Sequence, residues 1–114
     1  MANSDRYRAY DVVVVPFPYS DRMAEKRRPA LVISSLALSR FGVLWIAMIT
    51  SAANERWSCD VAIEDLDRAG LPGPSVVRPA KITAIEPARV LRRAGVVDAA
   101  TAKKVAGYLS RFTA

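Results

Sequence analysis

Residues 11–35 read DVVVVPFPYSDRMAEKRRPALVISS, which is two apolar runs separated by a short charged segment. The first run, residues 12–15 together with Phe17, is β-branched and aromatic, and this composition favours a strand over a helix. Pro16 and Pro18 each remove a backbone hydrogen-bond donor. We therefore expect the first strand to end at Phe17 and the chain to turn there.

The second apolar run, residues 30–33, follows Pro29, and proline is tolerated at the first residue of a strand. The segment between the two strands is expected to be a loop, and loops held by strands commonly present functional side chains. Its charged residues are Asp21, Arg22, Glu25, Lys26, Arg27 and Arg28.

The composition is that of one small basic domain spanning residues 1–114, of which 52% are hydrophobic. Lys and Arg number 17 against 11 Asp and Glu, and the resulting net charge of +6 favours polyanionic partners. Nucleic acid or an acidic protein is the first expectation. Many small basic proteins are merely soluble, so the charge alone identifies neither.

The chain has one cysteine, Cys59, and no histidine. An internal disulfide, a zinc site of ordinary type and a Cys–His dyad are therefore excluded within one chain, and no metal or other cofactor is expected. No apolar run approaches the roughly 18 residues that span a bilayer, and the N-terminus lacks the apolar core of a signal peptide. We expect a cytoplasmic protein with no membrane partner.

Further strands are predicted along the middle of the chain. Residues 43–49 form an apolar run that ends at Thr50, and residues 51–58 form a polar loop carrying Trp57. Later segments are predicted as a short strand at residues 59–63, an irregular stretch at 64–74 pinned by Leu66 and Leu71, strands at 75–78 and 81–85 divided by Pro79, and a helical turn between Pro87 and Gly95.

The last segment has the pattern of an amphipathic helix. Asp98 can cap it, and an apolar stripe recurs at three- and four-residue spacing through Ala102, Val105, Leu109 and Phe112. Gly107 weakens this helix by about 1 kcal/mol relative to alanine, either for close packing or because it is tolerated. Short strands followed by a terminal helix predict a strongly bent antiparallel sheet or small barrel with the helix packed on it.

Three segments together resemble the MazF/PemK family of toxins from bacterial toxin-antitoxin pairs. They are YDVVVVPFPYSDRMAEKRRPALVIS, VLWIAMITS and GLPGPSVVRPAKITAIEPARV, and the likeness spans about residues 10–93. The resemblance implies a mainly β fold with α, a small SH3-like antiparallel β-barrel with a C-terminal helix. It also implies a metal-independent endoribonuclease that cuts single-stranded RNA at short sequences, dimerises, and is silenced by an acidic antitoxin.

The family's motifs fall on particular residues here. The catalytic arginine before proline matches Arg28, and the catalytic threonine at the end of the third strand matches Thr50. Glu25 is the nearest match to a loop glutamate found in some members, although the usual position is occupied by Met23. Tyr10 stands where many members carry a glycine, a departure that affects only a turn.

The chemistry of RNA cleavage is compatible with these residues. RNA carries its own nucleophile, the 2′-OH, so a protein can act by orienting that group and stabilising the charge that develops on the phosphate. Arg28 is cast as the fork of donors to the phosphate, because arginine is too basic to accept a proton. Thr50 would donate to a non-bridging oxygen, and Glu25 could accept the 2′-OH proton.

Several other side chains could contact RNA. Trp57 could stack on an unpaired base, and the remaining candidates for phosphate contact are Arg22, Lys26, Arg27, Ser75, Arg78 and Lys81. Each has an ordinary alternative, since a tryptophan is as commonly buried and loop or strand-edge charges are commonly just solvated. The cleavage motif and the class of target RNA do not follow from the sequence.

Two alternative functions remain at this stage. The gyrase poison CcdB shares the expected fold but works through a C-terminal Trp-Gly-Ile, whereas this chain ends YLSRFTA. A basic RNA-binding module without activity would bind RNA in a salt-dependent way and leave it intact.

Overall fold

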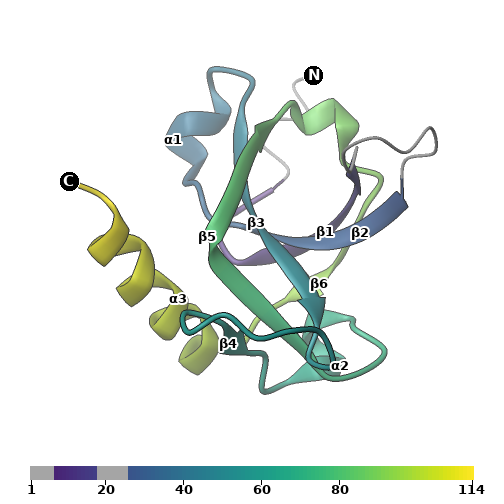
Figure 1. Cartoon of the computed structure of the whole chain (residues 1–114). Helices are drawn as coiled ribbons and strands as arrows, with labels where there is room; N and C mark the ends of the chain where they lie inside the picture. Colours follow the sequence, from purple (N-terminus) through teal and green to yellow (C-terminus); the bar gives the residue numbers. More distant parts are fainter. Residues whose placement is uncertain (1–6, 18–25) are drawn as a thin grey trace.

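A computed structural model describes residues 7–17 and 26–114. Six antiparallel strands form one curled sheet in the order β4-β5-β3-β2-β1-β6 (Figure 1). The strands are β1 (Asp11–Phe17), β2 (Lys26–Val32), β3 (Leu44–Ser51), β4 (Val61–Ala62), β5 (Ser75–Ile85) and β6 (Arg92–Val96). The helices are α1 (Leu36–Ser39), α2 (Leu66–Ala69), the 3-10 turn η2 (Pro87–Arg89) and α3 (Ala99–Phe112). The expected bent antiparallel sheet with a terminal helix is confirmed, as an open half-barrel.

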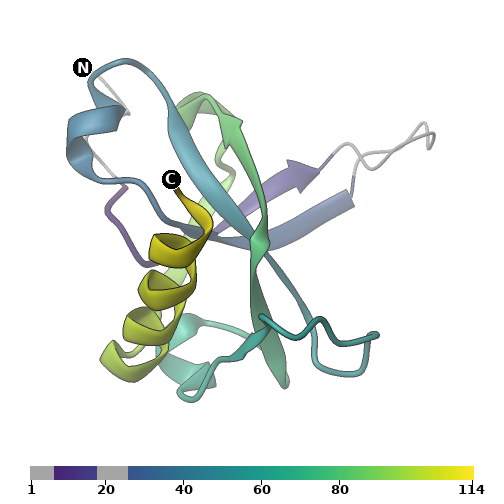
Figure 2. The ribbon, with the colours of Figure 1, turned by 60° about the vertical axis from the view of Figure 1, so that its left-hand side comes forward.

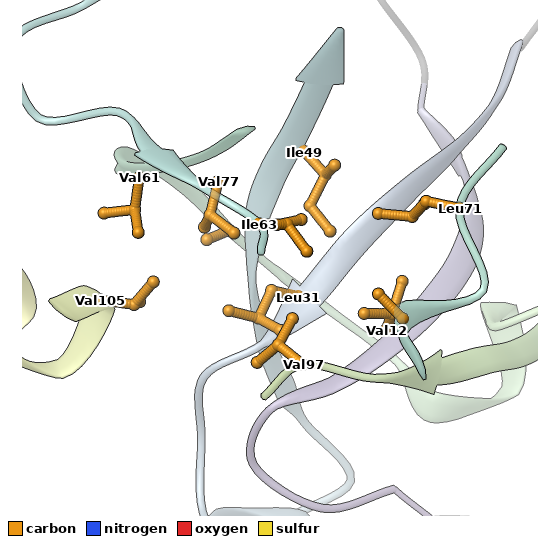
Figure 3. Packing of buried hydrophobic residues seen from close by; sticks show 11 residues of the cluster. Val12, Leu31, Ile49, Val61, Ile63, Leu71, Val77, Val97 and Val105 are labelled. Carbon is orange, nitrogen blue, oxygen red and sulfur yellow. The ribbon is translucent and has the colours of Figure 1, made fainter. Parts of the chain in front are cut away.

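The two faces of the sheet bury two separate apolar clusters, because successive residues of a strand point to opposite faces. One cluster faces α2 and α3, and we call this side the helix face; Val12, Leu31, Ile49 and Val105 belong to it (Figure 3). The cluster on the opposite face is Tyr7, Val13, Val15, Ala30, Val32, Leu44 and Ile46. Figure 2 shows α3 on one side of the sheet, with the end of β1 and the start of β2 extending away from it.

Strand β1 ends at Phe17 as predicted, but the prediction that β2 starts after Pro29 is wrong. β2 already begins at Lys26, so Arg27 and Arg28 lie in a strand and not in a loop. The first residues of β2 are extended because they pair with β1 from Lys26 onward, whereas the ladder between β2 and β3 covers only Ala30–Val32. Within residues 7–17 and 26–114, Pro29 pairs with Val14 of β1 and has no partner in β3, so the missing donor can face the unpaired side.

Strand β5 is continuous over 11 residues, which corrects the prediction of two strands divided at Pro79. Met48 of β3 pairs with Arg78, and the adjacent Ala47 pairs with Ile82, so residues 79–81 have no partner in β3. A bulge of this kind bends a strand and accommodates a proline that cannot donate to the ladder. The bulge therefore takes up Pro79 without ending β5.

Two segments predicted as irregular or helical have other structures. Residues 64–74 contain α2, whose N-cap Asp65 accepts a hydrogen bond from the backbone N–H of Arg68 and whose C-cap Gly70 has a φ of 73°. The helical turn predicted to run from Pro87 to Gly95 stops at η2, and the chain continues as β6, paired with β1. The packing roles predicted for Leu66 and Leu71 are confirmed.

The C-terminal helix follows its prediction closely. Asp98 caps α3 by accepting from the backbone N–H of Thr101 at 3.0 Å, and Val105 is fully buried against the sheet. A Cβ added at Gly107 would meet no atom within 4 Å, so this glycine is tolerated and does not serve close packing. No helix in the described part of the chain is long and apolar enough to span a membrane.

Candidate active site

Arg28 and Thr50 lie on neighbouring strands and point to the same face of the sheet. Along β2, Leu31 points to the helix face and Ala30 points to the opposite face. Because side chains alternate along a strand, Arg28 points to the same face as Ala30. Thr50 follows Ile49, which belongs to the helix face, so its side chain also points to the opposite face. The ladder between β2 and β3 ends at the pair Ala30–Met48, so Arg28 and Thr50 each lie two residues beyond it, and Thr50 itself pairs with Val76 of β5.

A pocket of about 440 Å³ opens on this same face, between the end of β1, the middle of β3 and the bulged part of β5. It is lined by Val15, Pro16, Met48, Lys81, Ile82, Thr83, Ala84, Ile85, Glu86 and Arg89. Val15 is the strand partner of Arg28, and Met48 is the partner of Ala30, so the pocket is lined by strand partners of β2 and by no residue of β2 itself. Its charged lining is two cations and one carboxylate, and exposed Ile82 supplies an apolar surface.

The Thr50 hydroxyl is already engaged by the loop that follows β3. Thr50 is 6% exposed, and its Oγ1 accepts a hydrogen bond of 2.6 Å from the Nδ2 of Asn54. Sequence reasoning missed Asn54. The available signal was a polar side chain four residues beyond Thr50, in the segment predicted as a polar loop.

Arg78 is buried in an ion pair, not on the exposed strand edge that the sequence suggested. Its Nε and one terminal nitrogen donate to the two carboxylate oxygens of Asp60 at 2.9 and 3.0 Å. The same terminal nitrogen donates to the backbone oxygen of Glu55 at 2.8 Å, and the guanidinium lies 4.4 Å from the ring centroid of Trp57. These contacts fasten the 52–60 loop to β5.

Burial and hydrogen bonding oppose each other at Asp60. Burial favours the neutral carboxyl group and raises its pKa, but the hydrogen bonds from Arg78 and from the backbone N–H of Trp57 outweigh this effect. The net result is that the pKa of Asp60 lies below its ordinary value, while the bond to Asp60 raises the pKa of Arg78. The pair is therefore ionised at neutral pH.

The other predicted RNA contacts divide between the two faces. Lys26 shares the face of Arg28 by strand alternation, and Lys81 lines the pocket there. Arg27 points to the helix face, where it borders a second cavity of about 420 Å³ with Pro29 and Arg92. Ser75 also belongs to the helix side, and its hydroxyl donates to the Gly73 carbonyl at 2.8 Å.

Trp57 is 43% exposed, so part of its ring is accessible beside the buried Arg78. Arg22 and Glu25 lie outside the described residues. Over residues 7–17 and 26–114 there is no group of three or more acidic, cysteine or histidine side chains that could hold a metal ion.

The sequence matches the model of the PemK-like, MazF-like toxins of type II toxin-antitoxin systems over residues 8–113. Among solved structures, MazF from Deinococcus radiodurans is similar at 24% identity with a TM-score of 0.72, covering 92% of this chain and 94% of that one. A MazE-MazF structure from the same organism is similar at 23% identity with a TM-score of 0.73, covering 92% of this chain and 94% of that one. A mycobacterial endoribonuclease in complex with its cognate antitoxin is similar at 20% identity with a TM-score of 0.70, covering 92% of this chain and 90% of that one. No curated protein matches the chain.

Proposed function

The chain belongs to the PemK-like, MazF-like toxins of type II toxin-antitoxin systems, and we propose that it is a metal-independent endoribonuclease that cuts single-stranded RNA at short sequences. The observation that supports the proposal is that Arg28 and Thr50 point to the same face of the sheet, each two residues from the pair Ala30–Met48, and that a partly cationic pocket opens on that face. The similar mycobacterial protein is itself described as an endoribonuclease.

In the proposed reaction the RNA supplies the nucleophile. The 2′ oxygen forms a bond to phosphorus as the bond from phosphorus to the 5′ oxygen breaks, which leaves a 2′,3′-cyclic phosphate and a 5′-OH end. The Arg28 guanidinium would hold two phosphate oxygens, and Thr50 would donate to a non-bridging oxygen, so both stabilise the charge of the transition state. Glu25 is the candidate acceptor of the 2′-OH proton.

The surface around Arg28 would guide the RNA strand. Lys26 and Lys81 are on the appropriate face to contact phosphates, and the accessible part of Trp57 could stack on a base. Arg22 remains a candidate for the same role. Arg27 and Ser75, on the helix side, would contact only RNA that passes around the end of the sheet. Arg78 would act through Trp57 and the 52–60 loop.

Two partners belong to the proposal. We expect an acidic cognate antitoxin to cover the basic face, and a second copy of the chain to form a homodimer in the cytoplasm. The similar MazE-MazF and toxin-antitoxin structures support an antitoxin partner. Coexpression with the antitoxin should restore the growth of cells that express the toxin.

The direct test is incubation of the purified protein with a long single-stranded RNA in EDTA, followed by mapping of the cut ends. We expect discrete cuts with 2′,3′-cyclic phosphate and 5′-OH termini, no cuts in DNA of the same sequence, and loss of cutting in Arg28→Ala. Retained but intact RNA would favour a binding module instead. Cuts that persist in Arg28→Ala would contradict the assigned site.

A further inference from the structure

The 2.6 Å contact between Asn54 and Thr50 has a direction, which follows from the chemistry of the two groups. The amide nitrogen of asparagine can only donate, so the Thr50 oxygen must accept. A hydroxyl that accepts on its oxygen keeps its own hydrogen for another acceptor. Among the described residues, Thr50 Oγ1 makes no hydrogen bond other than the one with Asn54.

We propose that Asn54 is a positioning residue that holds the Thr50 hydroxyl with its hydrogen directed at the scissile phosphate; this inference rests on the proposed ribonuclease function. Without such a partner, a strand threonine commonly turns its hydrogen to a nearby backbone carbonyl. In that orientation it would present lone pairs to the phosphate, which repel a developing anion. The hydrogen bond from Asn54 occupies one lone pair of the Thr50 oxygen, so that lone pair cannot face the phosphate, and it polarises the hydroxyl as a donor.

Asn54 is itself exposed, so its position must come from the loop on both sides of it. On the near side, its backbone N–H donates to the Ser51 carbonyl at 3.1 Å, and the Ala53 N–H donates to Ser51 Oγ at 3.2 Å. On the far side, the buried Arg78 holds the carbonyl of Glu55 at 2.8 Å.

Asp60, whose side chain is fully buried, extends this anchorage beyond Glu55. One of its carboxylate oxygens accepts from the backbone N–H of Trp57 at 2.9 Å, and the carboxylate is paired with Arg78. The ion pair between Arg78 and Asp60 therefore fixes the loop that carries the side-chain amide of Asn54.

Substitutions of Asn54 test whether it sets the direction of the Thr50 hydroxyl hydrogen or merely contacts Thr50. Asn54→Ala should lower kcat about tenfold, the rate equivalent of one ordinary hydrogen bond, with KM within about twofold. Asn54→Asp should lower kcat further, because a carboxylate accepts and would draw the Thr50 hydrogen away from the phosphate. Asn54→Gln keeps the donor and should retain part of the rate that Asn54→Ala loses.

Ser58 provides matched controls in the same loop, since it is exposed and has no hydrogen bond within residues 7–17 and 26–114. Ser58→Ala controls for a lost polar group, and Ser58→Asp controls for an added negative charge near the RNA. Both should keep the kcat of the unmodified protein. All variants should melt within about 3 °C of one another, because exposed substitutions change stability little.

The decisive measurement is single-turnover cleavage of one RNA in EDTA by these variants, alone and combined with Thr50→Ala. If Asn54 acts through the Thr50 hydroxyl, its substitutions have no further effect once Thr50→Ala has removed that hydroxyl. The inference is overturned if Asn54→Asp matches Asn54→Ala, if the losses fall on KM alone, or if they persist in Thr50→Ala. An unmodified protein that cuts no RNA would overturn the proposed function itself, a distinct result.

Discussion

Arg27 and Arg28 are neighbours in β2, yet the pleat of the strand sends their side chains to opposite faces. This pair allows a test in which charge and position along the chain are almost constant. Arg28→Ala should lower kcat by roughly 10²–10³, the cost of one preorganised donor to a developing anion. Arg27→Ala should change KM alone. Cleavage at saturating RNA measures the difference.

A second substitution at Arg28 separates the effect of its positive charge from that of its planar guanidinium group. Arg28→Lys keeps the positive charge but loses the planar fork that grips two phosphate oxygens, so it should resemble Arg28→Ala more than the unmodified protein. Arg40→Ala, which removes an exposed arginine at the end of α1, should cut RNA at the normal rate. Full activity in Arg28→Lys would show that a point charge suffices.

The ion pair between Arg78 and Asp60 has a structural role that mutation can reveal. Arg78→Ala should lower the free energy of unfolding by about 3 kcal/mol, because it removes both guanidinium hydrogen bonds from the fully buried side chain of Asp60 and leaves it only the more distant Arg56, whose Nε is 3.7 Å away, and the backbone N–H of Trp57. Arg78→Ala combined with Asp60→Ala should cost less than the two single losses added together. Urea denaturation measures both. Normal stability with weakened RNA binding in Arg78→Ala would instead restore the phosphate contact suggested by the sequence.

Among the elements, α3 and β6 contain glycines with opposite surroundings. Gly107 in α3 has open space at its Cβ position, so Gly107→Ala should stabilise the protein by about 1 kcal/mol through helix propensity. Gly95 in β6 packs directly on the backbone of Arg68 and Ala69 in α2, so Gly95→Ala should destabilise it by about 1–3 kcal/mol. Thermal melts of the two variants should shift in opposite directions; a lower melting temperature for Gly107→Ala would contradict the open site.

The elements that the sequence predicted are those with a strong local pattern. Strands β1 and β3 are long apolar runs, and α3 has both a cap at Asp98 and a regular apolar stripe. Strand β6 was missed because RRAGV has little apolar character, and its extended form comes from pairing with β1. The continuity of β5 through Pro79 depends on a bulge against β3, which is a property of two strands together.

The candidate site shows the same division. The sequence offers Arg28 and Thr50 as candidates, because a resemblance attaches roles to particular motifs. The partner of Arg78 could not be identified from the sequence, since Asp60 lies 18 residues away and meets it only after β4 and β5 pair. The direction of the Thr50 hydroxyl likewise depends on a turn that returns Asn54 to the strand end.

At the scale of the whole molecule, two carboxylates link stability to pH. Burial raises the pKa of Asp98, but hydrogen bonds, chiefly from the backbone and hydroxyl of Thr101, outweigh it, and the pKa lies below its ordinary value as at Asp60. A group whose pKa is lower when folded contributes its full stabilisation above the unfolded value, near 3.8. This contribution is lost as the pH falls through the lower folded value.

The free energy of unfolding should therefore decrease below about pH 4, where the unfolded chain binds protons first. Asp60→Asn and Asp98→Asn should each be less stable at pH 7 and show a shallower decline in acid, because one titrating group is removed. Urea denaturation at a series of pH values between 7 and 2.5 measures this. An unchanged acid slope in both variants would contradict the assigned pKa shifts.

In the proposed reaction the protein provides donors from Arg28 and Thr50, and the RNA provides the nucleophile. This division of roles is tested most directly by comparing cleavage of one mapped RNA with that of a copy carrying a single 2′-deoxy nucleotide immediately 5′ of the scissile phosphate. We predict that the substituted RNA binds with similar affinity and stays intact at that phosphate. Cleavage there at the normal rate would contradict the account, because the attacking oxygen would then come from elsewhere.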